Sequence, residues 1–193
     1  MSLNVGLIAL EGNHAADLIE FFGATGYRLA GVEWLGTKEA ADALAQPDGR
    51  IVRKASYYDA AWTIIVDPEL TLAADLDALA AFSREHDCRV CACICAGTAG
   101  SYGFFLCAAG QTLREIEVTA GVAEHNHGDT LKGEPQAVEN LDETALLALF
   151  AKTVSPYDQF EVEREYSVYS LVCGDHRFTL DIPLEKKPWW KFW

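Results

Sequence analysis

The most constraining feature of this sequence is a run of four cysteines within eight residues, from Cys88 to Cys95. Cys91, Cys93 and Cys95 alternate with apolar residues at the two-residue period of a β-strand, so these three thiols should share one face. Same-face neighbours on a strand lie about 6.5–7 Å apart, whereas thiolates bound to one tetrahedral zinc ion lie about 4 Å apart. We therefore predict a buried strand lined by small sulfur-containing side chains, with a thiolate metal or redox site as the less favoured alternative.

The composition is that of a globular chain that can bury a substantial core. Half of the 193 residues are hydrophobic and 23% are charged. No apolar run approaches the roughly 18 residues that a membrane-spanning helix requires. The first residues lack the basic region and cleavage site of a secretory signal, and the six cysteines suit reduced thiols. We expect a cytoplasmic protein.

The net charge of −14 narrows the classes of partner. Nucleic acid and anionic membrane surfaces both attract clustered lysine and arginine, so neither is expected to bind this chain. A basic protein partner is compatible with the charge, and simple solubility is the alternative explanation. Residues 115–165 hold twelve acidic and three basic residues, so a surface for a cationic partner should draw on this part.

Alternating hydrophobic periods along the chain predict an α+β fold. Strands are expected at residues 5–10, 27–34, 51–58, 62–66, 90–95, 104–108 and 111–119, and helices at residues 15–22, 37–44, 72–85 and 141–152. Residues 120–140 read as a long loop or irregular edge, and residues 160–182 as two or three further strands. We predict a mixed, mostly antiparallel sheet with helices packed on one face.

The chain reads as one α+β domain over residues 1–183, followed by an aromatic C-terminal tail over residues 184–193. The tetrapeptide Ala-Ala-Asp-Leu occurs at residues 15–18 and again at residues 73–76. Both copies lie in a strand–helix–strand unit. This pattern allows an internal duplication of residues 1–60 and 61–120.

A glycine-rich stretch, Gly97 to Gly103, follows the cysteine strand. A phosphate-binding loop needs a helix after it and a lysine within it, whereas this stretch has no lysine and leads into another strand. A hairpin connection is therefore favoured. Tyr102, beside this turn, is a candidate partner contact.

The best metal-binding candidate is the segment around His125, His127 and Asp129. In an extended chain the two imidazoles share a face and can reach one ion, with Asp129 continuing that face. Glu134 would supply a further ligand. The alternative is a polar turn with solvated histidines.

The other histidines carry weaker signals. His14 follows a turn and opens a helix, so a surface or capping role is expected, with a catalytic role as the alternative. His86 and His176 have no companions in the sequence.

Two further groups are candidate partner-binding residues. Glu161, Glu163 and Glu165 occur at strand spacing and form either a stripe for a cationic partner or one solvated face. The tail contains Trp189, Trp190 and Trp193, whose apolar area is costly to leave in water. The tail should fold over the protein's own surface, or anchor a partner or a second copy.

The block from Trp62 to Glu134 resembles small uncharacterised bacterial proteins, some of them immunity-type antitoxins. The resemblance is carried by the following residues: Ser101-Tyr-Gly-Phe-Phe-Leu, Gly110, Arg114, Gly128 and Glu134. It implies an acidic, non-enzymatic cytoplasmic protein that binds another protein, with no functional residues to carry over.

Our leading hypothesis is an acidic binding protein, without a cofactor, that uses its C-terminal half against a protein partner. A small-molecule or metal-dependent enzyme, or a ligand-binding protein, with His125, His127 and Asp129 at its site, is the alternative. A homodimer that exchanges its aromatic tails is a third interpretation.

Overall fold

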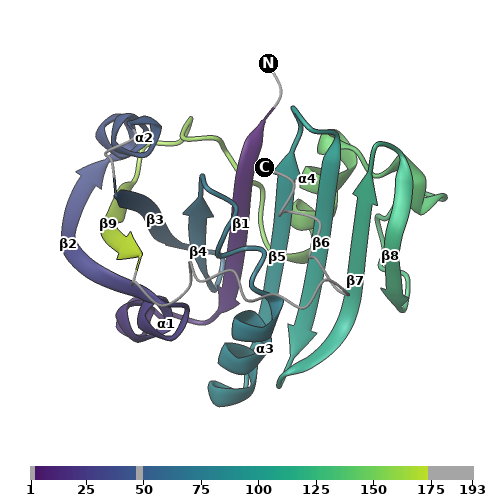
Figure 1. Ribbon diagram of the computed structural model, residues 1–193, viewed down its shortest axis with the longest axis horizontal. Coiled ribbons are helices and arrows are strands. Elements are labelled where there is room, and N and C mark those ends of the chain that lie inside the picture. The colour runs from purple at the N-terminus through teal and green to yellow at the C-terminus, as the bar shows by residue number, and fades with distance from the viewer. Residues whose placement is uncertain (1–2, 47–49, 174–193) are drawn as a thin grey trace.

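The computed structural model describes residues 3–46 and 50–173, and the described residues form one open antiparallel sheet with helices on both sides (Figure 1). The sheet order is β2-β9-β3-β4-β1-β5-β6-β7-β8. The strands are β1 (Asn4–Glu11), β2 (Tyr27–Gly36), β3 (Ile51–Asp59), β4 (Trp62–Asp67), β5 (Arg89–Ala96), β6 (Ser101–Ala108), β7 (Gln111–Thr119), β8 (Val122–Gly128) and β9 (Glu165–Cys173). The predicted α+β class is confirmed.

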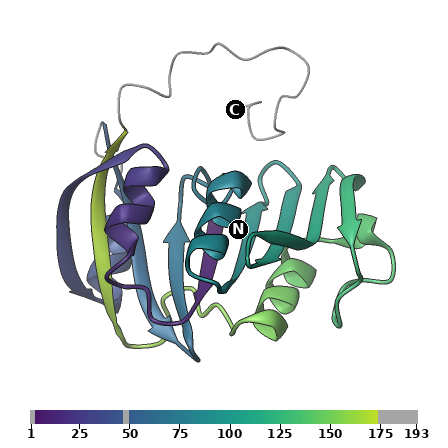
Figure 2. The same ribbon diagram turned by 90° about the horizontal axis from the view of Figure 1, so that it is seen from below.

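The helices cover the two faces of the sheet in pairs, which corrects the expectation of helices on one face (Figure 2). They are α1 (Leu18–Ala24), α2 (Thr37–Ala45), α3 (Leu76–Glu85) and α4 (Glu143–Thr153), with a short 3-10 helix, η1 (Val138–Asn140). α1 and α3 pack on one face, and α2 and α4 on the other. The reason lies in the central strand β1, where the neighbours Leu7 and Ile8 point to opposite faces and are both fully buried. None of the helices in the described ranges is long and apolar enough to cross a bilayer.

The cysteine strand is β5, and its alternating thiols lie on one face as predicted. Cys91, Cys93 and Cys95 are buried in the same core cluster as Leu146 and Phe150 of α4. Burial raises the pKa of the Cys91 and Cys93 thiols, and it raises that of Cys95 to about 11. Such thiols stay protonated near neutral pH, so this face serves as packing surface rather than as a set of thiolate ligands.

The two strand–helix–strand units within residues 1–60 and 61–120 place their helices on the same face of the sheet but connect their strands differently. α1 and α3 lie on the same face and touch through Phe21 and Phe82, whose ring centroids are 5.0 Å apart. In the sheet order, strands β4, β3 and β9 lie between β1 and β2, whereas only β1 lies between β4 and β5. The internal duplication stays a prediction.

The segment expected as a long loop or irregular edge, residues 120–140, contains the edge strand β8 and η1. β8 is held by backbone pairing with β7, and most of its side chains are exposed. Its hydrophobicity therefore gives little strand signal. Of the strands expected within residues 160–182, β9 is described, while residues 174–182 and the tail at 184–193 lie outside the described residues.

The glycine-rich stretch forms the hairpin connection between the antiparallel neighbours β5 and β6, as predicted, with residues 97–100 in the turn and residues 101–103 in β6. This hairpin places Tyr102 on β6, opposite Cys95 of β5 and Val118 of β7.

Candidate functional site

The three glutamates predicted to contact a partner lie together where the chain enters β9. Glu161 and Glu163 belong to the loop before the strand, and Glu165 is the first residue of β9, so strand spacing does not extend through all three. Gln159 and Phe160 have positive φ angles of 50° and 64°, which turn the chain before the strand begins. All three glutamates are exposed. We name residues 158–165 the acidic loop.

The acidic loop is held in one conformation by its own polar groups. The Asp158 carboxylate accepts a hydrogen bond from the Phe160 backbone N–H at 3.1 Å, and the Asp158 carbonyl accepts from the Glu161 N–H at 2.9 Å. The Thr37 hydroxyl oxygen, at the start of α2, accepts from the Arg164 N–H at 2.8 Å. Phe160 packs against Tyr166, with ring centroids 4.9 Å apart. The glutamates are therefore displayed from an ordered frame.

The single base of the acidic loop is used internally. The Arg164 guanidinium forms an ion pair with Asp158, lies 4.0 Å from Asp59 and stacks over the Tyr57 ring at 4.3 Å. Glu161, Glu163 and Glu165 form no ion pair with any residue in the described ranges. Within the described part of the chain, the loop therefore presents three unpaired carboxylates at the surface.

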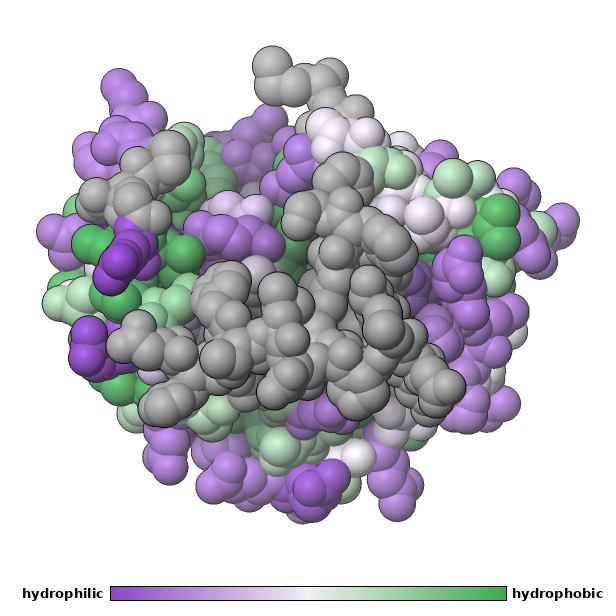
Figure 3. Space-filling model, in the orientation of Figure 1, coloured by the Kyte–Doolittle hydropathy of each residue, from purple (hydrophilic) through white to green (hydrophobic). Residues whose placement is uncertain are grey.

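Two exposed aromatic side chains adjoin this charge. Trp34 of β2 is 73% exposed and lies opposite Ser167, two residues along β9 from Glu165 and on the same face. Tyr58 of β3 is 55% exposed and lies on this face too, because Ser56 also pairs with Ser167. Figure 3 shows apolar residues scattered among polar ones at this β2–β9–β3 end of the molecule.

The predicted metal-binding residues lie at the opposite edge of the sheet. His125 and His127 share a face of β8, opposite Glu117 and Glu115 of β7, and both are exposed. Asp129 follows the strand. Among the described residues these three do not form a group of ligand atoms that could close on one ion.

Glu134, the expected additional ligand, is committed elsewhere. Its carboxylate accepts two hydrogen bonds from the Arg114 guanidinium, at 2.8 and 2.7 Å, and both side chains are 1% exposed. Arg114 also donates to the Asn126 side chain at 2.8 Å and the His127 carbonyl at 2.9 Å. This bidentate pair fixes the segment after β8 to the sheet and engages both oxygens of the Glu134 carboxylate.

Tyr102, the remaining described candidate, is half-buried in an open hollow between the β5–β6 turn and the start of α4. Gly100, Glu139 and Asp142 share the lining of this hollow. Burial is the largest cause that raises the pKa of the Tyr102 hydroxyl, and Glu143 and Asp142 contribute. Trp189, Trp190 and Trp193 lie outside the described residues.

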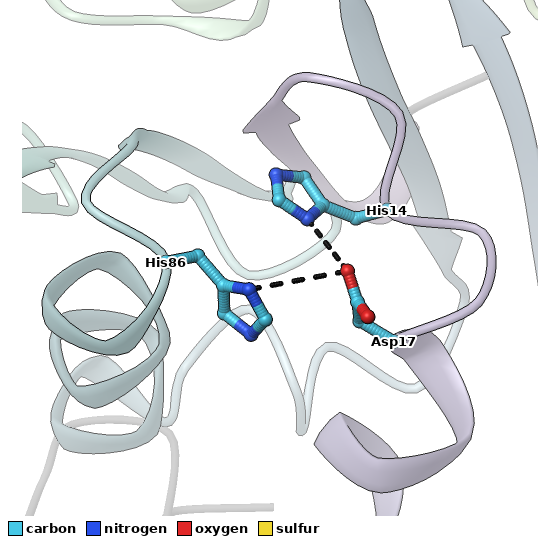
Figure 4. A group of neighbouring side chains, drawn as sticks. All are labelled: His14, Asp17 and His86. Atoms are coloured by element: carbon cyan, nitrogen blue, oxygen red, sulfur yellow. Dashed lines mark hydrogen bonds and ion pairs between the residues drawn. The ribbon is translucent and has the colours of Figure 1, made fainter.

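The structure brings together one group of side chains that the sequence did not connect. His14 precedes α1, Asp17 occupies the N-cap position of α1 without a side-chain capping hydrogen bond, and His86 follows α3 at its C-cap position (Figure 4). Nδ1 of His14 is 2.9 Å from Asp17 Oδ2, and Nδ1 of His86 is 3.9 Å from the same oxygen. The two histidines are 72 positions apart, so spacing offered no signal. The sequence did place each histidine at the end of a predicted helix, and this was the only indication that they could meet if the two helices packed on the same face of the sheet.

Comparison of the chain with protein-family models, with curated proteins and with solved structures finds no match. The resemblance to immunity-type proteins therefore stays a prediction.

Proposed function

We propose that this protein is a non-enzymatic binding protein that holds a basic protein partner, as an immunity-type protein holds its target. The acidic loop and the adjoining Trp34 and Tyr58 would form the binding surface. The observation that carries the proposal is the set of three exposed glutamates that form no ion pair with any described residue, next to two exposed aromatic rings.

The two kinds of side chain would contribute differently to binding. Uncompensated carboxylates at the rim attract a cationic partner and speed association, an effect that salt screens over about 10 Å at 0.1 M. Tryptophan and tyrosine are the residues most enriched among those that dominate binding energy, because they bury a large area with little loss of conformational entropy. The ordered frame around Asp158 and Thr37 lowers the cost of fixing the loop on binding.

The proposal is tested with charge-reversed variants of the full chain. Wild-type protein, the triple variant Glu161→Lys/Glu163→Lys/Glu165→Lys and a control would be used as baits in extracts of the cells that produce the protein. The control reverses three exposed acids at the other edge of the sheet: Glu124, Asp129 and Glu139. Both variants change the net charge equally, so a difference between them reports position rather than total charge.

We expect at least one basic protein to be retained by wild type and by the control variant and lost by the acidic-loop variant. Its affinity for purified wild type, measured by titration calorimetry, should fall as salt is raised, and Trp34→Ala should weaken it by about tenfold or more. Equal retention by all three baits, or loss with the control variant alone, would show that the acidic loop is not the binding surface.

A further inference from the structure

The group of His14, Asp17 and His86 has the composition of a transition-metal site. One ring nitrogen of each histidine and one carboxylate oxygen of Asp17 lie within 4.8 Å of one another. Two imidazoles and one carboxylate are a ligand set that zinc and other divalent first-row metals use in proteins, often with water at a remaining position. We propose that these three side chains bind one divalent transition-metal ion, with zinc as the best chemical match.

The distances are close to those that zinc requires. With metal–ligand bonds of about 2.0–2.1 Å, ligand atoms of a tetrahedral zinc site are about 3.3 Å apart. The separations from Asp17 Oδ2, 2.9 Å to His14 and 3.9 Å to His86, bracket this value. The His86 and Asp17 side chains are 27% and 39% exposed. Small rotations of these two side chains would bring the ligands into place and leave an open side for water.

The hydrogen bonds of His14 favour a cation at this point. Nε2 lies 2.8 Å from the Glu11 carbonyl oxygen and Nδ1 faces the Asp17 carboxylate, so both nitrogens meet acceptors. A neutral imidazole has one N–H and cannot donate to both. If Nε2–H donates to Glu11, the Nδ1 lone pair is free for a metal, and a backbone carbonyl behind the other nitrogen is a common support for a ligating histidine.

Neighbouring groups hold the ligands in position. The backbone N–H of His14 donates to the Thr63 hydroxyl oxygen at 2.8 Å, and that hydroxyl donates to the Gly12 backbone carbonyl at 2.8 Å. The His86 ring stacks on Phe82 with centroids 4.1 Å apart, and the His14 ring meets the edge of the same side chain at 5.2 Å. The carbonyl groups at the C-terminal end of α3 add a field that favours positive charge near His86.

The carboxylate of Glu11, whose backbone carbonyl lies 2.8 Å from Nε2 of His14, is already engaged. Glu11 accepts hydrogen bonds from Arg89 at 2.9 and 2.6 Å, which lowers the pKa of its carboxyl group. Glu11 therefore supports the site through its backbone carbonyl, and the ligand set remains His14, Asp17 and His86.

Zinc and cobalt titrations of the full chain test the site. Titration calorimetry with Zn²⁺ should give one ion per chain, and Co²⁺ should show visible absorption of a low-coordinate nitrogen–oxygen site. His86→Gln and Asp17→Asn, chosen because these side chains are partly exposed, should each weaken zinc binding by about tenfold or more. The control His125→Gln/His127→Gln removes the other histidine pair and should keep wild-type affinity.

Several results would overturn the proposal. They are wild-type protein that binds no zinc at millimolar concentration, binding unchanged in both His86→Gln and Asp17→Asn, or binding lost in the His125→Gln/His127→Gln control. A near-ultraviolet thiolate-to-cobalt band would place the ion on cysteine and would also overturn it.

Discussion

Lys54 of β3 is fully buried, and its ammonium group forms ion pairs with the carboxylates of Asp67 and Glu69. Asp67 Oδ2 also accepts from the backbone N–H groups of Leu72 at 2.7 Å and Ala73 at 3.0 Å. Burial is the largest single influence on the pKa of Lys54 and would lower it, but the combined interactions with Asp67, Tyr27 and Glu69 raise it. This network fixes the segment that leads into α3, and with it the position from which His86 extends.

Removing the cation of this network should be strongly destabilising. Lys54→Met leaves the buried Asp67 carboxylate without its partner, and we expect a loss of about 3–5 kcal/mol in the free energy of unfolding, measured with urea. The exposed Lys38→Met is the control and should change stability by less than about 0.5 kcal/mol. Equal stabilities of the two variants would contradict this account.

Glu117 of β7 should make stability depend on pH. Burial, followed by the charges of Glu124 and Glu115, raises its pKa to about 7. At low pH the carboxyl group is protonated in both states. As pH rises from about 4.3 to 7 the unfolded chain releases the proton first, so the folded state loses stability.

Glu117→Gln should remove this fall in folding stability as pH rises, because glutamine does not ionise. We expect the variant to match wild type near pH 4 and to exceed it by about 1–3 kcal/mol at pH 8, in urea unfolding followed at both pH values. The exposed Glu139→Gln should show no such divergence. A stability difference that is the same at both pH values would refute the assignment to Glu117 ionisation.

At the scale of elements, the Arg114–Glu134 pair joins the segment after β8 to the sheet. Arg114→Met should leave the buried Glu134 carboxylate unpaired, lower stability by about 3–5 kcal/mol and speed amide exchange in residues 129–137. Hydrogen–deuterium exchange with mass spectrometry measures this. Faster exchange spread evenly over the sheet, without a local maximum in that segment, would argue against this role.

Gly128 ends β8 in a conformation that needs glycine. Its φ angle is +88°, and a Cβ there would lie 2.0 Å from the Leu113 carbonyl oxygen. Gly128→Ala should therefore cost more than about 2 kcal/mol in thermal or urea unfolding. Gly31→Ala, where a Cβ meets no atom within 4 Å, is the matched control and should be nearly neutral. A neutral Gly128→Ala would contradict the close approach.

A strand or helix could be predicted from the sequence when it buries many apolar side chains. The β1 and β5 segments were recognisable because nearly every residue is apolar. β8 was missed because its exposed polar side chains carry no period and its order comes from pairing with β7. The three glutamates were expected at strand spacing, but only Glu165 lies in β9, because the chain bends at Gln159 and Phe160 through hydrogen bonds that no spacing reveals.

The candidate metal ligands also show that tertiary contacts are not readable from a single sequence. His125 and His127 drew attention because they are neighbours in the chain, yet their expected partner Glu134 pairs with Arg114. His14 and His86 meet through the packing of α1 and α3 on one face, a tertiary contact that a single sequence does not encode locally.

At the scale of the whole molecule, the sheet separates two chemically different ends. The β2–β9–β3 end has the acidic loop with Trp34 and Tyr58, and the β8 end has the exposed histidines and the Arg114–Glu134 anchor. The proposed metal ligands lie between them, where α1 and α3 meet (Figures 1 and 4). Binding of a protein at the acidic loop and of a metal at His14 should therefore be separable by mutation, because no residue is shared.

The most direct test of the proposed function is amide exchange of the protein with and without its captured basic partner. We predict protection of residues 158–165, together with the strand segments around Trp34 and Tyr58, and unchanged exchange at β8. Protection centred on β8 or on the hollow around Tyr102, with the acidic loop unaffected, would contradict the account.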